Sequence, residues 1–295
     1  MIKPLFTGCG IAMITPFNED GVNRDALDKL TDYLLENAAD ALIACGTTGE
    51  PSTLTDAEKD LVIAGVVRRV NGRVPVIAGT GGNDTRAAVL AAHRAAALGA
   101  DAQLCVTPYY NKTTQRGLLE HYLRIADDGS LPVIIYNVPS RTGLNMTPQT
   151  LETLSRHENI IAMKEASGDI TQCADMVRLC DGRLSFYAGN DDMLLPCLAL
   201  GFHGVISVAG NIIPRAMGDI VRRFAAGDIE GARELQYRFD PLIDALFLEV
   251  NPIPVKTAAT LMGFEAGPLR LPLFEMSAEN LAVLTCRMRK AGLIP

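Results

Sequence analysis

The sequence has little of what marks a metalloenzyme or a secreted protein. Its four histidines are scattered without an H-E-x-x-H pattern, and its seven cysteines include no C-x-x-C pair. The odd number of cysteines, several of them inside apolar stretches, predicts buried free thiols in a reducing compartment. No apolar run approaches the ~18 residues of a membrane span, and no signal-peptide core is visible. We therefore expect a cytoplasmic protein with no metal centre.

Basic charge and the common nucleotide motifs are also scarce. The chain carries 27 Lys and Arg against 34 Asp and Glu, a formal net charge of −7. This balance disfavours nucleic acids and anionic membranes as partners. The sequence contains no Walker-type loop, no dinucleotide fingerprint and no G-x-S-x-G nucleophile elbow. Any chemistry must therefore come from side chains outside these motifs.

Eight short apolar runs recur along the 295 residues, and they are continuous rather than alternating with polar residues. Such runs are typical of strands buried on both faces of a parallel sheet. Segments with helical spacing lie between them, for example Leu27, Leu30 and Leu34. Eight alternations favour an α/β fold of the closed (β/α)8 TIM barrel type, with an open doubly wound sheet as the alternative. The expected strands are 10–15, 41–46, 75–80, 102–107, 132–137, 160–165, 184–189 and 204–209.

The strand pattern ends near residue 227. Beyond it, apolar residues from Ile229 to Val250 recur at helical spacing, and 277–291 is another helix candidate. We therefore predict a (β/α)8 catalytic barrel over 1–227 and a small all-helical C-terminal domain over 228–295. Within the barrel, Thr55 with Glu58 predicts a capping box, and Thr147 before Pro148 predicts another helix start.

Lys164 is the clearest candidate for catalysis. It stands in an apolar strand, Ile160 to Ala166, and an ammonium is rarely buried there because its desolvation is costly. The same desolvation lowers a lysine pKa and leaves a free amine that can attack a carbonyl. The alternative is a structural ion pair with the adjacent Glu165 or with another carboxylate near the end of the strand.

Polar residues follow the other expected strands where a barrel carries its chemistry. The turn Gly46–Gly49 offers backbone N–H groups and hydroxyls to an anion, or is simply a structural βα turn. Tyr136 is a candidate proton donor and acceptor, or a core tyrosine. Arg141 could bind a carboxylate, or be a solvated loop charge. The pair Tyr109 and Tyr110 suits a subunit interface. A cation site at Asn190–Asp192 is less expected than a helix N-cap.

Six segments in order along the chain resemble the dihydrodipicolinate synthase/N-acetylneuraminate lyase family over essentially the whole length. The segments are Gly46–Glu50 (GTTGE), Thr107–Asn111 (TPYYN), Tyr136–Gly143 (YNVPSRTG), Lys164–Ala166 (KEA), Gly204–Val208 (GVISV) and Asn251–Lys256 (NPIPVK). The resemblance implies a TIM barrel and a lysine that forms a covalent imine with a keto acid.

The same resemblance implies a role for each candidate residue. Lys164 forms the imine with pyruvate, and Thr47 and Thr48 hold the pyruvate carboxylate. Tyr136, Thr47 and Tyr110 form a proton relay, with Tyr110 supplied by a neighbouring subunit. Two further assignments concern binding: Arg141 receives the carboxylate of L-aspartate 4-semialdehyde, and the backbone at Ile206 and Gly189 lines the pyruvate pocket.

The implied activity is a class I lyase reaction that condenses pyruvate with L-aspartate 4-semialdehyde, in the diaminopimelate route to lysine. The lysine acts as the electron sink, so no cofactor is expected. The implied assembly is a homotetramer built as a dimer of dimers. Two alternatives remain: a sister pyruvate-dependent aldolase that cleaves N-acetylneuraminate or 2-keto-3-deoxy sugar acids, and a non-catalytic protein that binds a keto acid.

One departure from the family pattern concerns feedback by lysine. Asn83 and Tyr109 match the interface cleft that binds lysine in inhibited members. Ala87, however, stands where those members have a glutamate, and Asp56 and Lys59 stand where they have histidines. Losing an acid and gaining a cation weakens the attraction for a second ammonium. We therefore expect weak or absent inhibition by lysine.

Overall fold

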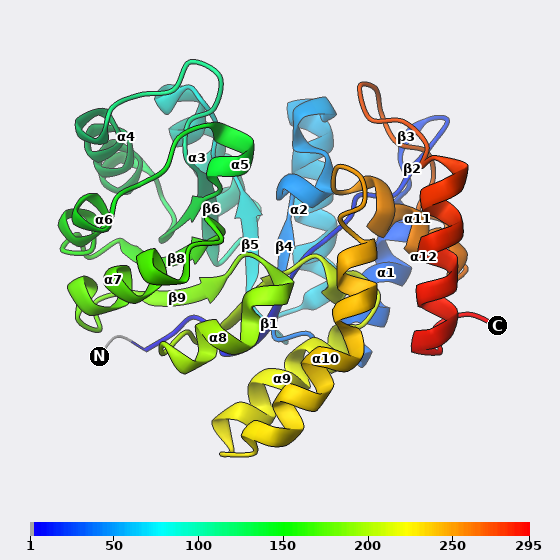
Figure 1. Cartoon of the computed structure of the whole chain (residues 1–295). Coiled ribbons are helices and arrows are strands. Elements are labelled where there is room, and N and C mark those ends of the chain that lie inside the picture. The colour runs from blue at the N-terminus through cyan, green and yellow to red at the C-terminus, as the bar shows by residue number, and fades with distance from the viewer. Residues whose placement is uncertain (1–2) are drawn as a thin grey trace.

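A computed structural model describes residues 3–295. Eight parallel strands close into a barrel in the order β1-β10-β9-β8-β7-β6-β5-β4, with helices around it (Figure 1), which confirms the TIM-barrel prediction. The barrel strands are β1 (Gly8–Ala12), β4 (Ala41–Ala44), β5 (Val76–Gly79), β6 (Ala102–Val106), β7 (Val133–Asn137), β8 (Ile160–Glu165), β9 (Ser185–Ala188) and β10 (Gly204–Ser207).

Helices follow the strands and cover the outside of the barrel. Thr55 and Glu58 form the expected capping box, and the Thr147 side chain accepts a hydrogen bond from the Thr150 N–H. Both predicted helix starts are therefore confirmed. The barrel helices are α1 (Arg24–Glu36), α2 (Asp56–Val70), α3 (Thr85–Ala97), α4 (Gln115–Asp128), α5 (Pro139–Thr142), α6 (Pro148–Leu154), α7 (Ile170–Cys180), α8 (Leu194–Ala199) and α9 (Pro214–Ala225).

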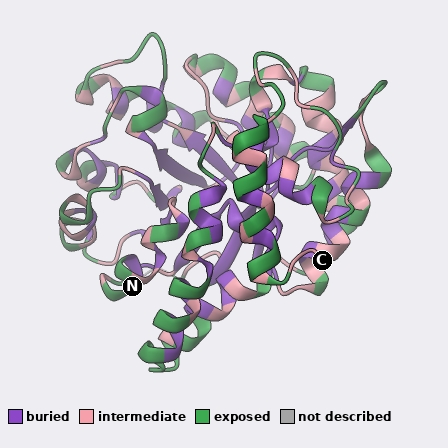
Figure 2. Cartoon of the chain, turned by 45° about the vertical axis from the view of Figure 1, so that its right-hand side comes forward, coloured by how far each residue is buried: buried purple, intermediate pink, exposed green. Residues whose placement is uncertain are grey.

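The core has two layers, because side chains along each strand alternate between the barrel interior and the helices. Ile134, Tyr136 and Ile206 belong to the smaller interior cluster, whereas Met163 belongs to the larger cluster that includes helix residues. Figure 2 shows that the strands are buried, whereas each helix is buried on the side toward the barrel and exposed on the outside. Lys164 lies two residues after Ala162, which belongs to the interior cluster, so its side chain points to the same side of the strand and enters the barrel.

The first strand differs from its prediction. It runs from Gly8 to Ala12, not over 10–15, and Met13 and Ile14 are buried beyond its end. Their apolar character reflects burial, although the Met13 N–H still donates to the Ile43 carbonyl of β4 at 3.1 Å. The antiparallel hairpin of β2 (Phe17–Asn18) and β3 (Gly21–Val22) follows, and these two-residue strands are too short to leave a pattern in the sequence.

Three helices complete the chain: α10 (Ile229–Ala245), α11 (Ile253–Leu261) and α12 (Ala278–Ala291). The structure confirms the candidate at 277–291. The stripe expected up to Val250 is too long, because α10 ends at Ala245 and Val250 is 56% exposed. Helix α10 packs on α9 and α12. The division at residue 228 stays a prediction.

Two further expectations concern the cysteines and the membrane. Six cysteines are buried free thiols, but Cys286 on α12 is exposed, so burial of all seven was wrong. None of the helices in the described part of the chain has the length and apolar character needed to cross a bilayer.

Candidate active site

Lys164 lies near the end of β8, paired in register with Tyr136 of β7. The lysine residue is 4% exposed, and its Nζ lies 4.3 Å from the centre of the Tyr136 ring. Among the ion pairs and hydrogen bonds found within residues 3–295, none involves Nζ of Lys164, and only burial and two nearby charges act on its pKa. The contact with the ring face is the type that suits an ammonium, but it supplies no acceptor.

Burial lowers the pKa of Lys164 from 10.5 to about 8. Two charges modify this effect: the nearby Asp191 carboxylate raises the pKa, and the Arg141 guanidinium lowers it. A substantial fraction of the side chain is therefore the neutral amine near pH 8, which is the form that attacks a carbonyl.

The structural alternative, an ion pair between Lys164 and Glu165, is wrong. Glu165 faces away from the barrel interior, as the alternation along a strand requires. Its carboxylate accepts hydrogen bonds from the Asn137 side chain at 3.0 Å and the Ser167 backbone N–H at 2.7 Å. Its burial raises its own pKa. Lys164 is thus left without the carboxylate next to it in sequence.

Tyr136 and Thr47 form the second part of the site. Burial raises the pKa of Tyr136 to about 12, and a hydrogen-bonding contact with the Thr47 side chain lowers it. Thr47 begins a short 3-10 turn, η1 (Thr47–Gly49), directly after β4. The phenol therefore stays protonated at neutral pH, beside a hydroxyl that can pass a proton.

Gly189, directly after β9, lies beside the lysine, and Ile206 is on the next strand, β10. Ile206 belongs to the same interior cluster as Tyr136. The Gly189 N–H donates to the Glu165 carbonyl at 2.7 Å. A Cβ on Gly189 would lie 3.2 Å from Lys164 Cε and 2.6 Å from the Ala166 Cβ. The absence of a side chain at this position leaves the lysine its space.

Thr48 and Arg141 are joined by Asn251, for which the sequence predicted no role. The Asn251 side-chain amide donates to Thr48 Oγ1 at 3.0 Å, and the Asn251 carbonyl accepts from Arg141 Nη2 at 3.1 Å. Arg141 lies on α5 after β7 and is exposed, but its guanidinium donates to the Asn251 carbonyl and its charge lowers the pKa of both Lys164 and Tyr136. Two candidate carboxylate-binding groups thus meet at Asn251.

Tyr110 lies apart from this group. Its side chain is 91% exposed, and the residue has a left-handed φ of 65°. The neighbouring Tyr109 is 38% exposed, and its carbonyl accepts from the Asn83 amide at 3.2 Å. The single chain therefore brings Lys164, Tyr136 and Thr47 together, and leaves Tyr110 projecting from the loop after β6.

Asp191 is a residue whose place was misjudged from sequence. The expected N-cap at Asn190 makes no side-chain capping bond. Instead, Asp191 is buried, and its Oδ2 accepts from the backbone N–H groups of Val208 and Ala209 at 3.0 and 2.8 Å. Its influence on Lys164 arises because Asp191 follows β9, the strand that pairs with β8, and no local pattern could have shown this.

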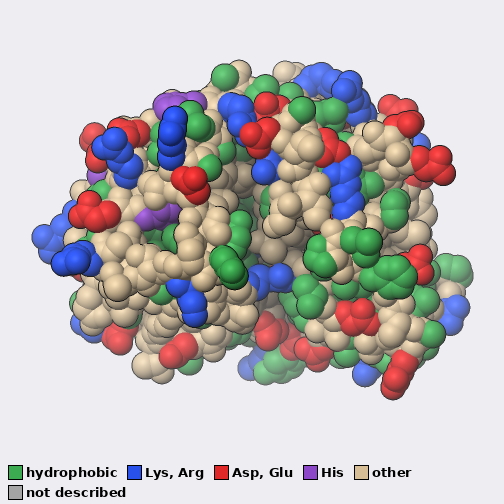
Figure 3. All heavy atoms as spheres, turned by 90° about the horizontal axis from the view of Figure 1, so that it is seen from above, with side chains coloured by type: hydrophobic (Ala, Val, Ile, Leu, Met, Phe, Trp, Pro, Cys, Tyr) green, Lys and Arg blue, Asp and Glu red, His purple; other side chains and the backbone are tan. Residues whose placement is uncertain are grey.

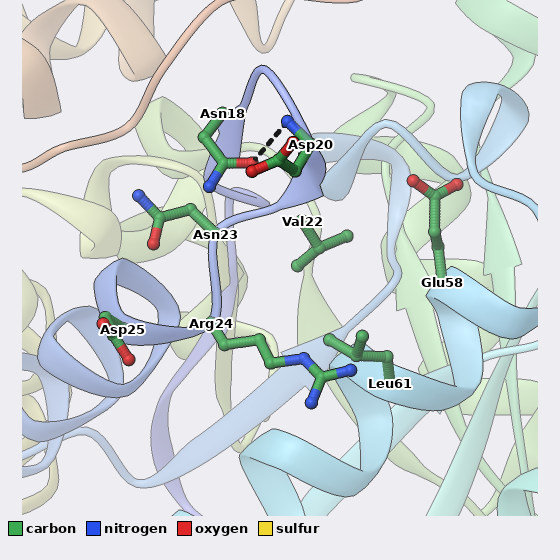
Figure 4. A pocket seen from close by; sticks show the side chains of 8 residues that line it. All are labelled: Asn18, Asp20, Val22, Asn23, Arg24, Asp25, Glu58 and Leu61. Carbon is green, nitrogen blue, oxygen red and sulfur yellow. Dashed lines mark hydrogen bonds between the residues drawn. The ribbon is translucent and has the colours of Figure 1, made fainter.

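The face of the barrel that carries α5 and the β2–β3 hairpin is uppermost in Figure 1, and Figure 3 shows it hollowed near the middle. A separate surface hollow of ≈ 390 Å³ lies beside the hairpin (Figure 4) and contains none of the predicted site residues. Its lining consists of Asn18, Asp20, Val22, Asn23, Arg24, Asp25, Glu58 and Leu61. Across residues 3–295, no group of three or more metal-ligating His, Cys, Asp or Glu side chains is found.

Comparison with known proteins gives a consistent result along the chain. The model of the Dihydrodipicolinate synthetase family matches residues 5–290. A relative from Thermoanaerobacter pseudethanolicus, named 4-hydroxy-tetrahydrodipicolinate synthase, is 52% identical over 292 residues, which cover 99% of this chain and 98% of the relative.

Two solved structures agree with this result. Dihydrodipicolinate synthase from Aquifex aeolicus is 44% identical with a TM-score of 0.95, covering 98% of this chain and 99% of the other. The enzyme from Cyanidioschyzon merolae, solved with lysine bound, is 40% identical with a TM-score of 0.96, covering 99% and 100%.

Proposed function

This chain belongs to the dihydrodipicolinate synthetase family, and from that premise we propose that it catalyses the 4-hydroxy-tetrahydrodipicolinate synthase reaction. In this reaction, pyruvate condenses with L-aspartate 4-semialdehyde on the route to diaminopimelate and lysine. The observation that carries the proposal is the buried, unpaired Lys164 with its pKa lowered to about 8. A lysine in this state is suited to form a Schiff base.

The first half of the proposed reaction builds a nucleophile. The Lys164 amine attacks the keto carbon of pyruvate, and loss of water gives an iminium. The positive nitrogen withdraws electrons, so the pyruvate methyl group loses a proton and an enamine forms. Tyr136 and Thr47 carry protons in these steps, and the Thr48 hydroxyl with the backbone of the turn holds the pyruvate carboxylate.

The second half joins the two substrates. The enamine carbon attacks the aldehyde of the semialdehyde, whose carboxylate is held by Arg141. The amine of that substrate then displaces Lys164 by transimination and closes the ring, which releases 4-hydroxy-tetrahydrodipicolinate and the free lysine. The lysine supplies the electron sink, so these steps need no cofactor. The backbone at Gly189 and Ile206 borders the pocket.

The proposed assembly is a homotetramer made of two tight dimers. Its support is the loop after β6, where Tyr110 is 91% exposed, so that its phenol is available to a neighbouring subunit. In a dimer, this tyrosine completes the proton relay in the partner's site. A large apolar side chain projecting from a loop is a common anchor at subunit interfaces.

The test is reductive trapping. Protein incubated with pyruvate and borohydride should gain one pyruvate-derived adduct, located by mass spectrometry on the peptide that holds Lys164. Lys256 is a matched internal control, because it is equally buried but paired with Glu50 at 2.7 Å and should remain unmodified. A protein that forms no adduct, or forms it elsewhere, would leave a non-catalytic keto-acid binder as the better explanation.

A coupled assay separates the proposal from the sister aldolases. We expect product from pyruvate with L-aspartate 4-semialdehyde, and no cleavage of N-acetylneuraminate or 2-keto-3-deoxy sugar acids. Arg141 favours the first reaction, because a guanidinium beside the site suits a short substrate that carries its own carboxylate.

A further inference from the structure

The segment Asn251–Lys256 has no part in the proposed mechanism, yet two of its side chains are buried against the turn Gly46–Glu50, which carries Thr47 and Thr48. Asn251 is 5% exposed and Lys256 is 1% exposed. Both belong to the C-terminal helical region, about two hundred residues further along the chain than the turn they contact. Long polar side chains are rarely buried without a specific partner.

The Nζ of Lys256 has polar partners, unlike that of Lys164. Its Nζ donates to Glu50 Oε1 at 2.7 Å and to the Pro268 carbonyl at 2.8 Å, and it lies 4.1 Å from the centre of the Phe17 ring. The other carboxylate oxygen of Glu50 accepts from the Arg270 backbone N–H at 3.0 Å. Each charge therefore has the additional hydrogen bonds that a buried pair requires.

Glu50 ends the turn in a strained conformation. Its φ is 55°, the left-handed region that residues with a side chain seldom adopt. In this conformation its carboxylate accepts from Lys256 and from the Arg270 N–H together, and these contacts hold the residue in place. Strain of this type persists where the surrounding contacts impose it, and it is concentrated at functional sites.

Asn251 acts on the middle of the same turn. Its amide donates to Thr48 Oγ1 at 3.0 Å, so the oxygen of Thr48 is engaged as an acceptor. The hydroxyl proton of Thr48 is then free to be donated to a carboxylate. The backbone carbonyl of Asn251 meanwhile holds Arg141 at 3.1 Å.

We propose that Asn251 and the Lys256–Glu50 pair are positioning residues, which hold the turn Gly46–Glu50 in the shape that binds the keto-acid carboxylate. This inference rests on the proposed function, because it assumes that the turn receives pyruvate. The C-terminal helical region thereby takes part in substrate affinity without touching the substrate. Its loss raises the KM for pyruvate and leaves the chemistry at Lys164 intact.

Two variants test this. The double variant Glu50→Gln with Lys256→Met removes both charges together, so that no buried charge is left unpaired, and glutamine keeps an acceptor for Arg270. Asn251→Leu is similar in volume and removes the donor to Thr48. Its side-chain Oδ1 is buried without a partner in the described chain, so the substitution breaks only one side-chain hydrogen bond.

The matched control is Lys29→Met with Glu265→Gln. This pair, at 3.4 Å, also joins the barrel to the C-terminal region, but both side chains are more than half exposed and neither contacts the turn. We expect the control to have wild-type kinetics. For both test variants, we expect the KM for pyruvate to rise at least tenfold, with kcat within threefold and the melting temperature within a few degrees of the wild type.

The remaining measurements separate the possible failures. At saturating pyruvate, borohydride should trap Lys164 in the variants as completely as in the wild type, and the KM for the aldehyde should stay the same in Asn251→Leu, which keeps the carbonyl that binds Arg141. A pyruvate KM within twofold of the wild type would overturn the proposal, as would a parallel fall in kcat and melting temperature at constant KM. If the double variant does not fold, the KM for pyruvate of Asn251→Leu alone decides whether the proposal holds. A wild-type protein that is itself inactive and untrapped would instead refute the proposed function.

Discussion

Replacing Arg141 by methionine and Asp191 by asparagine should shift the reactivity of Lys164 in opposite directions along the pH scale. The Arg141 cation lowers the pKa of Lys164, and the Asp191 carboxylate raises it, on top of the larger lowering by burial. Removing the cation therefore raises the pKa, and neutralising the carboxylate lowers it. Neither change restores the ordinary value of 10.5, because burial remains.

The expected size follows from the wild-type value of about 8. At pH 7, about one amine in eleven is unprotonated, and at pH 8 about one in two. Imine formation with pyruvate should thus become about tenfold faster per pH unit below pH 7 and level off above pH 8. In Arg141→Met the rise of the trapping rate with pH should move to higher pH, so that trapping at pH 7 is slower than in the wild type. In Asp191→Asn this rise should move to lower pH, and trapping at pH 7 is faster.

The assay is the initial rate of trapping by cyanoborohydride at saturating pyruvate, from pH 6 to 9.5 at constant ionic strength. The aldehyde is omitted, so the binding role proposed for Arg141 does not enter. Arg156→Met is the control, because this arginine is 70% exposed and pairs with Glu152 on the outside of the barrel. Its profile should coincide with that of the wild type. Shifts of the same sign in both test variants, or a wild-type rate that still rises about tenfold per pH unit up to pH 9.5, would refute the electrostatic argument.

Three further predictions follow from the site. Gly189→Ala should slow trapping of Lys164 at least tenfold and lower the melting temperature, because the new Cβ would lie 2.6 Å from the Ala166 Cβ. The control Gly82→Ala, whose new Cβ would have nothing within 4 Å, should match the wild type, and equal trapping rates in the two variants would contradict the prediction. Mixing inactive Tyr110→Phe with inactive Lys164→Ala subunits should restore part of the activity, and hybrids as inactive as their parents would show that each site uses one chain. Lysine should inhibit weakly or not at all, since Ala87 offers no carboxylate to a second ammonium and Lys59 adds a cation; half-inhibition below 1 mM in steady-state kinetics would disprove it.

The barrel and the catalytic end could be predicted because their signals are local. A strand buried on both faces shows as a short apolar run, and the polar residues directly after it must lie at one end of the barrel. This reasoning led to Lys164, Tyr136 and Thr47, and the structure brings these three together. The boundaries of β1 and α10 were less certain, because Met13 and Val250 are apolar without belonging to either element.

Asn251, Asp191 and the partner of Glu50 could not be assigned from the sequence, for one physical reason. Each acts through a contact between elements that are distant along the chain, and apolar periodicity says nothing about which elements meet. Asn251 lies 203 residues from Thr48 and 110 from Arg141. The segment that contains it was recognisable as a motif, but its purpose becomes visible only when the barrel end and the C-terminal helices are seen together.

The two buried lysines show why reactivity is a property of the fold rather than of local sequence. Lys164 and Lys256 are both almost completely buried, and for both burial lowers the pKa. Lys164 follows Met163 in an apolar strand and has a glutamate beside it in sequence that points the other way. Lys256 follows Val255 in an apolar helix and has a glutamate 206 residues away that lies within 2.7 Å. Since an ion pair favours the charged form, Lys256 is held as an ammonium and fixes the turn, whereas Lys164 is free to lose its proton. The position of the nearby glutamate carboxylate therefore decides the role of each lysine: Lys256 is structural and Lys164 is chemical, although both stand in apolar segments of the sequence.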